Sequence, residues 1–98
     1  MKASQKAFLR SRARMVSPAV RIGRAGLTDA VLAHIGHLLD QRELVKVRMG
    51  QAPEGRRAAA EALAGTLRAE LIDVIGGMVV LYRRGDRLPA GKQSPLPD

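Results

Sequence analysis

The sequence predicts a single α/β domain with three helices and a small mixed sheet of four strands. Leu44–Met49 and, more briefly, Val20–Ile22 alternate apolar and polar residues in the manner of strands. Gly76-Gly77 separates two further apolar runs, which is typical of a two-residue hairpin. Helical periodicity fills the intervals between these strands, and a chain of 98 residues has room for one modest core.

The expected order is helix, strand, helix, strand, helix, strand, strand (α-β-α-β-α-β-β). Ser4 should cap the first helix and Thr28 the second. Helices that follow the first two strands favour parallel pairing there, whereas the hairpin implies an antiparallel pair. Residues 88–98 hold three prolines and no apolar period, so we expect a domain over 1–87 and a disordered tail. The expected bounds are Ser4 to about Met15, Val20–Ile22, Thr28 to about Arg42, Leu44–Met49, about Arg56 to Ala69, Leu71–Ile75 and Met78–Arg83.

The first helix is basic. Phe8 and Met15 should share one side, while Leu9 and Ala13 fall among the basic residues and make the amphipathic pattern imperfect. This thin apolar face makes a membrane-surface role the weaker interpretation. Basic residues recur at every fourth position, which places those within the helix along one side: Lys2, Lys6, Arg10 and Arg14.

The charge is strongly positive and unevenly distributed. Seventeen Lys and Arg against nine Asp and Glu give a net charge of +8 and a pI of about 11.3. Seven of the basic residues, and none of the acidic ones, precede Ala25. A polyanionic partner is the favoured explanation, and a charge that only maintains solubility is the alternative.

Composition and motifs also exclude several classes. The chain has no cysteine and therefore neither disulfides nor thiolate chemistry. His34 and His37 lack a convincing third ligand, so we expect no metal and no cofactor. Phe8 and Tyr82 are the only aromatic residues, too few for binding modes that stack several bases. We find no catalytic motif and no apolar run of membrane-spanning length, and expect a non-enzymatic, monomeric, cytoplasmic protein.

A glycine turn joins the first strand to the second helix. Gly23 and Gly26 permit backbone angles that other residues resist, and Thr28 should begin a helix there. A helix N-terminus beside Arg21 and Arg24 would attract a phosphodiester. The alternative is a tight turn in which the glycines serve geometry alone, and G-x-x-G is a weak signal by itself. Lys46 and Arg48, on the outer face of the second strand, form a further basic surface or are simply solvated.

Four motifs occur in a characteristic order: Ser4-x-x-x-x-Leu9-x-x-x-Ala13, Ile22-Gly23-Arg24-Ala25-Gly26-Leu27-Thr28, Glu43-Leu44-Val45-Lys46-Val47-Arg48 and Val74-Ile75-Gly76-Gly77-Met78-Val79-Val80-Leu81-Tyr82-Arg83. With them the chain resembles the CRM domain (chloroplast RNA splicing and ribosome maturation), in the stand-alone bacterial form of the YhbY-like proteins. The resemblance implies a KH-like RNA-binding module, similar in fold to the C-terminal domain of a bacterial translation initiation factor. It also implies a ribosome-assembly factor that associates with precursors of the large (50S) subunit.

The resemblance implies particular RNA contacts. The loop from Gly23 to Gly26 would lie against the RNA backbone. Where the family commonly has Lys or Arg, this chain has Gly77, so the contacts of that hairpin tip would pass to Arg83 and Arg84. We therefore expect a non-catalytic protein that binds ribosomal RNA, with a DNA-binding protein or a protein-interaction adaptor as the alternatives. The candidate RNA-binding residues are Arg21, Gly23, Arg24, Ala25, Gly26, Lys46, Arg48, Arg83, Lys6, Arg10 and Arg14.

Overall fold

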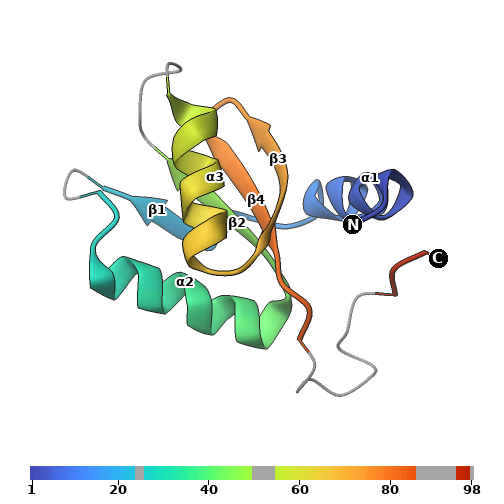
Figure 1. Ribbon diagram of the computed structural model, residues 1–98, viewed down its shortest axis with the longest axis horizontal. Coiled ribbons are helices and arrows are strands. Elements are labelled where there is room, and N and C mark those ends of the chain that lie inside the picture. The colour runs from blue at the N-terminus through green and yellow to red at the C-terminus, as the bar shows by residue number, and fades with distance from the viewer. Residues whose placement is uncertain (24–25, 50–54, 86–94, 98) are drawn as a thin grey trace.

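The computed structural model describes residues 1–23, 26–49, 55–85 and 95–97. The predicted α/β class and order of elements are confirmed, and the four strands form one mixed sheet (Figure 1). No helix among these residues is long and apolar enough to cross a membrane. The elements are α1 (Ala3–Ala13), β1 (Val20–Ile22), α2 (Asp29–Arg42), β2 (Leu44–Met49), α3 (Arg56–Thr66), β3 (Glu70–Ile75) and β4 (Met78–Tyr82).

The helix starts follow from local hydrogen bonds. Thr28 caps α2 as predicted, because its Oγ1 accepts from the Val31 N–H at 3.2 Å. The prediction for α1 was wrong in detail, since Lys2 rather than Ser4 occupies the N-cap position. The Lys2 N–H donates to Gln5 Oε1 at 3.0 Å, so a side chain inside the helix satisfies a backbone group at its start.

The strand order is β1-β2-β4-β3. β1 and β2 are parallel, as a helix between them predicts, and the hairpin pair β3–β4 is antiparallel. The expected parallel pair between β2 and β3 does not form. The crossover through α3 does not place β3 next to β2. Instead β4, which follows β3 in the hairpin, lies between them and is antiparallel to β2. β4 is therefore a central strand, and its residues support both faces of the sheet.

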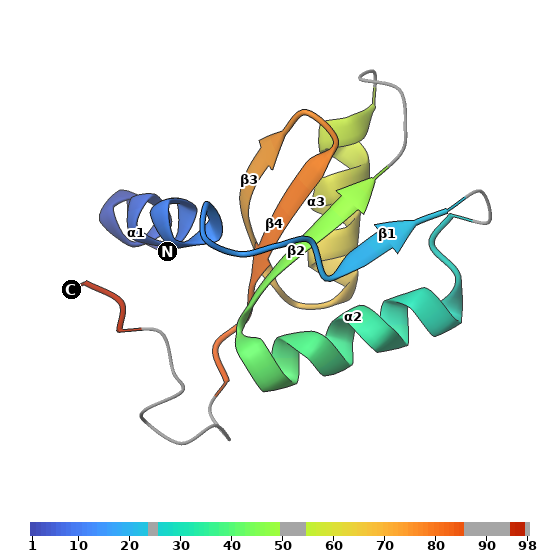
Figure 2. The same cartoon turned by 180° about the vertical axis from the view of Figure 1, so that it is seen from behind.

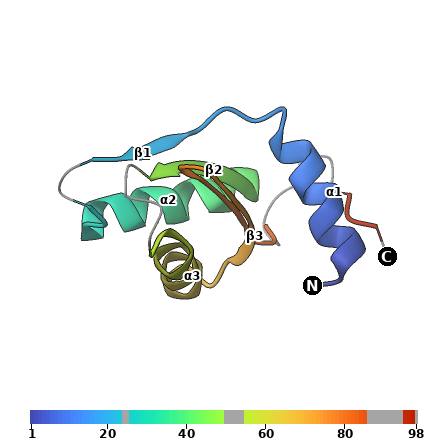
Figure 3. The same ribbon diagram turned by 90° about the horizontal axis from the view of Figure 1, so that it is seen from above.

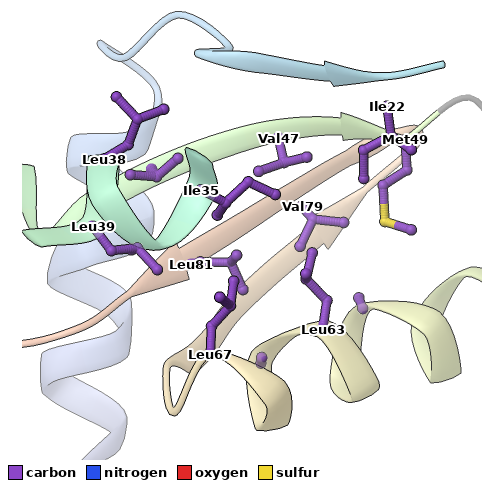
Figure 4. Close-up of a cluster of buried hydrophobic side chains, with 13 residues drawn as sticks. Ile22, Ile35, Leu38, Leu39, Val47, Met49, Leu63, Leu67, Val79 and Leu81 are labelled. Atoms are coloured by element: carbon purple, nitrogen blue, oxygen red, sulfur yellow. The ribbon is translucent and has the colours of Figure 1, made fainter. Parts of the chain in front are cut away.

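The main core lies between the sheet and the two helices α2 and α3 (Figure 4). Ile35 and Leu39 from α2 and Leu63 from α3 are almost completely buried there, against Val47 and Leu81 of the central strands. Alternation along β2 turns every second residue into this core and leaves the others for the opposite face. This arrangement determines where the basic residues of the sheet lie.

α1 packs on the opposite face of the sheet (Figure 3). Leu9 and Ala13 are its buried residues, at 0% and 4% exposure, whereas Met15 is 89% exposed. The expectation that Phe8 and Met15 form a common side was therefore wrong, because α1 ends at Ala13 and Met15 follows it. The sheet supplies the other members of this second cluster, namely Leu44, Ile72, Val80 and Tyr82.

Part of the predicted tail contacts the domain. Gln5 Nε2 donates to the Pro97 carbonyl at 3.1 Å, and Leu96 packs against the cluster beneath α1. Residues 86–94 and 98 lie outside the described residues, so the disorder of the tail as a whole stays a prediction.

Candidate nucleic-acid interface

Arginines of two neighbouring strands lie side by side on the sheet face that α2 and α3 leave open. Arg21 of β1 is in register with Arg48 of β2, and both are exposed. Val47 and Met49, which flank Arg48, and Ile22, which follows Arg21, are buried in the main core, so both arginines point to the opposite face. Lys46, two residues before Arg48, shares that face and is half-buried. The pattern within each strand was predictable, but the parallel register that joins Arg21 to Arg48 was not.

These cations border an accessible part of the sheet. In the view from behind, β1 and the end of β2 lie between α1 and the glycine turn, with no described helix in front of them (Figure 2). A shallow depression of about 340 Å³ lies over this region. Its lining residues are Pro18, Ala19, Val20, Arg21 and Arg48. A flexible polyanion could therefore reach both guanidinium groups without a change in the fold.

The two glycines of the turn differ in whether the structure requires a glycine there. The Gly26 N–H donates to the Gly23 carbonyl at 3.0 Å, and Gly26 has a φ of +73°, where a side chain is strained. A Cβ on Gly23, by contrast, would meet no atom within 4 Å. Packing inside the protein thus does not require a glycine at position 23, and its backbone is open to an external group. Arg24 and Ala25, which the sequence also predicts to bind RNA, lie outside the described residues.

The first helix adds cations beside the sheet. Arg10 Nε lies 3.3 Å from Asp73 Oδ2, and Arg14 follows one turn later on the same flank. Arg10 and Arg14 line one cavity together with Lys46 of β2. Lys6 lies one turn before Arg10 and is half-buried. The predicted basic side of α1 therefore lies along the flank that continues onto the sheet.

Sequence reasoning missed Asp73. The ladder between β3 and β4 shifts register between Leu71 and Asp73, which is the signature of a β-bulge. The bulge places Ile72 under α1 and still lets Asp73 reach Arg10 from the same face. Strict alternation would place Ile72 and Asp73 on opposite faces of the sheet. No local residue pattern predicts the bulge.

Arg83 lies in a setting unlike that of the other candidate residues. Its Nη1 donates to the Leu67 carbonyl at 2.8 Å, and its Nη2 donates to the Gly36 carbonyl and to Asp40 Oδ1, both at 2.7 Å. Only 26% of the side chain is exposed. The guanidinium therefore ties the end of β4 to the C-terminal parts of α2 and α3. This geometry favours a role in stability over the predicted contact with RNA.

The hairpin tip is closely packed against β2. The Met49 N–H donates to the Gly77 carbonyl at 2.7 Å, and a Cβ on Gly77 would lie 3.0 Å from the Met49 carbonyl oxygen. A basic residue at this position would therefore require a small shift of the tip. Arg83 and Arg84, expected to take over its RNA contacts, follow the opposite end of β4.

In the part of the chain that the structure describes, no group of three or more His, Cys, Asp or Glu could hold a metal ion. The residues that line the candidate interface are mainly cations and apolar side chains. Such a surface can bind a polyanion through its phosphates, with an affinity that falls as salt rises.

Comparison with known proteins places the chain in a family. The sequence model of the CRS1/YhbY (CRM) domain matches residues 1–83. The relative named "Probable RNA-binding protein YqeI", from Bacillus subtilis, is 37% identical over 94 residues, or 95% of each chain. A protein of Haemophilus influenzae named "RNA-binding protein" is 38% identical over 80 residues, or 81% of each chain.

The fold agrees with a solved structure. The solution structure of a hypothetical protein from Staphylococcus aureus matches with a TM-score of 0.81 and 33% identity, over 99% of both chains. The resemblance inferred from the four motifs is therefore confirmed at the levels of sequence and fold. This chain belongs to the CRS1/YhbY (CRM) domain family.

Proposed function

We propose that this protein is a non-catalytic RNA-binding protein that acts on ribosomal RNA during maturation of the large ribosomal subunit. It would work as a monomer in the cytoplasm. The RNA backbone would lie across the open sheet face, with the glycine turn at one end and the basic flank of α1 at the other.

The observation that carries this proposal is the row of cations on the open sheet face. Arg21 and Arg48 are exposed neighbours in register, and Lys46 continues the row toward α1. The exposed backbone at Gly23 lies just beyond β1, at the same sheet edge. Cations and exposed backbone in this arrangement bind phosphates irrespective of base identity. The names of the relatives support RNA as the polyanion, and membership of the CRS1/YhbY family, whose name we associate with ribosome maturation, supports a ribosomal target.

The alternatives of DNA binding and of a protein adaptor predict different behaviour. The outer face of α2 carries the exposed acidic residues Asp29 and Asp40, which disfavours insertion of this helix into a DNA groove. An adaptor with incidental charge would bind RNA weakly or not at all. Competition by duplex DNA against labelled ribosomal RNA therefore separates the three functions.

The decisive experiment is sucrose-gradient sedimentation of cell lysate at low and at raised salt, with the protein followed by antibody. Wild-type protein should sediment with large-subunit precursors and leave them as salt rises. The double variant Arg21→Gln/Arg48→Gln should remain at the top of the gradient.

A matched control removes two charges from the helical side of the domain. Arg42→Gln/Arg57→Gln changes exposed residues of α2 and α3 and should sediment like the wild type. If both double variants sediment alike, the open sheet face is not the binding surface. If wild-type protein stays at the top even at low salt, the ribosomal proposal fails.

A further inference from the structure

A small apolar cavity lies between α1 and the β3–β4 hairpin, next to the row of cations. Its volume is about 130 Å³, well below the roughly 300 to 1,000 Å³ of pockets for drug-sized ligands. The sheet contributes Val80, Met78 and Ile75, and α1 contributes Ala13. Ile75 is 60% exposed although it belongs to a strand. The cavity thus has room for one small group with apolar faces.

The cavity is lined by flexible cationic side chains and by a carboxylate that is held in place. Arg14 and Lys46 line it and have flexible cationic ends that attract phosphates to its mouth. Asp73 also lines it, held in place by Arg10 at 3.3 Å and by the Val74 N–H, which donates to Asp73 Oδ1 at 2.9 Å. A phosphate inside the cavity would meet this carboxylate, whereas an N–H or amino group could donate to it.

The strand register connects the cavity floor to the cations. Met78 is directly opposite Arg48, and Val80 is directly opposite Lys46. Adjacent strands are about 4.8 Å apart, so the cavity floor begins one strand beyond the row of cations, where we propose that phosphates bind. A single-stranded chain held at Arg48 can therefore turn a neighbouring base toward Met78 without leaving the surface.

We propose that this cavity binds one unstacked nucleobase of a single-stranded RNA segment whose phosphates lie on the row of cations. The base faces would contact Met78, Val80 and Ile75, the guanidinium of Arg14 would cover the base from the rim, and the base edge would donate to Asp73. Splayed RNA bases stack on arginine guanidinium planes, and flipped nucleotides are also held between apolar side chains, so this chain needs no aromatic platform. The inference rests on the proposed function and adds a base-binding subsite to it.

The test compares two oligonucleotides with equal charge. A uridine decamer and an abasic ribose-phosphate decamer of the same length carry the same phosphates, and only the first carries bases. The uridine decamer should bind about five- to tenfold more tightly, which is the lower end of what one base contributes when it stacks on an aromatic side chain. Methyl resonances of Met78 and Ile75 in NMR spectra should shift with the uridine decamer and stay in place with the abasic one.

Two variants locate the effect. Ile75→Asn changes an exposed side chain, so the fold should persist, and Met78→Gln keeps the length of the side chain. Each should bring the affinity for the uridine decamer close to that for the abasic decamer and leave the abasic affinity and its salt dependence unchanged. If Met78→Gln perturbs the fold, the Ile75 variant and the wild-type methyl shifts still decide the question.

The other outcomes refute the subsite in distinguishable ways. Equal, salt-dependent binding of both decamers with unmoved methyl resonances would exclude the base subsite and leave the phosphate surface intact. Tighter uridine binding that survives both variants would place the base contacts elsewhere. Failure of both decamers to bind at low salt would refute the proposed function together with the subsite.

Discussion

Replacing Arg83 by methionine should destabilise the fold and leave RNA affinity unchanged. Methionine keeps most of the apolar stem of arginine and removes the guanidinium. The partly buried carbonyls of Leu67 and Gly36 then lose a charged donor at 2.8 and 2.7 Å. Hydrogen bonds to charged groups contribute about 1.5 kcal/mol or more each. Since 26% of the Arg83 side chain is exposed, water partly replaces them, and we expect a loss of about 2 kcal/mol.

The ion pair with Asp40 should contribute little to that sum. The Asp40 side chain is 72% exposed, and exposed pairs contribute about 0 to 1 kcal/mol. Asp40→Asn is therefore the matched control, with a loss below about 1 kcal/mol. The loss is measured by urea unfolding followed by circular dichroism. In thermal unfolding of a domain of this size, about 2 kcal/mol corresponds to a Tm lower by about 10 °C.

The same variant discriminates between the two roles of Arg83. If Arg83→Met unfolds within about 0.5 kcal/mol of the wild type, the clamp contributes nothing measurable. If its RNA affinity also falls and its salt dependence becomes shallower, Arg83 is an RNA contact, as the sequence motif predicted. A loss of stability at constant affinity would establish the structural role.

Three further predictions concern the interface and α1. Arg21→Gln and Arg48→Gln should each lower the slope of log affinity against log salt by about 0.7 for single-stranded RNA, measured by fluorescence anisotropy, and an unchanged slope would exclude a phosphate contact. Gly23→Ala should weaken RNA binding with no change in unfolding, while Gly26→Ala, at a φ of +73°, should cost about 1 kcal/mol of stability; a Gly23 variant with full affinity would show that its open backbone is unused. Leu9→Ala should cost about 2 to 4 kcal/mol in urea unfolding, because Leu9 is 0% exposed, and a smaller loss would mean that α1 is loosely attached.

Local sequence patterns were sufficient for the elements themselves. The bounds of β1 and β2 were predicted correctly because alternation and the flanking turn residues are local signals. Thr28 was recognised as a cap because an N-cap depends only on its own helix. α3, by contrast, ends at Thr66 rather than Ala69, since Leu67 and the left-handed Arg68 turn the chain toward β3.

Properties that join distant segments were predicted less well. The insertion of β4 between β2 and β3 depends on how far a crossover carries the chain, which no local pattern encodes. The burial of Leu9 and Ala13 depends on which face of α1 meets the sheet. The hydrogen bonds from Arg83 to the Leu67 and Gly36 carbonyls form only where α2, α3 and β4 meet. The sequence motif around Arg83 does not distinguish this structural role from a contact with RNA.

The sequence by itself determined the class of fold, the family, the excess of positive charge and the strand residues that carry it. Each of these is a property of composition or of neighbours along the chain. Only the tertiary structure decided that Arg21 and Arg48 are adjacent, that Arg10 is paired with Asp73, and that an apolar cavity lies beside them. These are properties of strand register, of a β-bulge and of helix docking, which arise when segments far apart in sequence pack against one another.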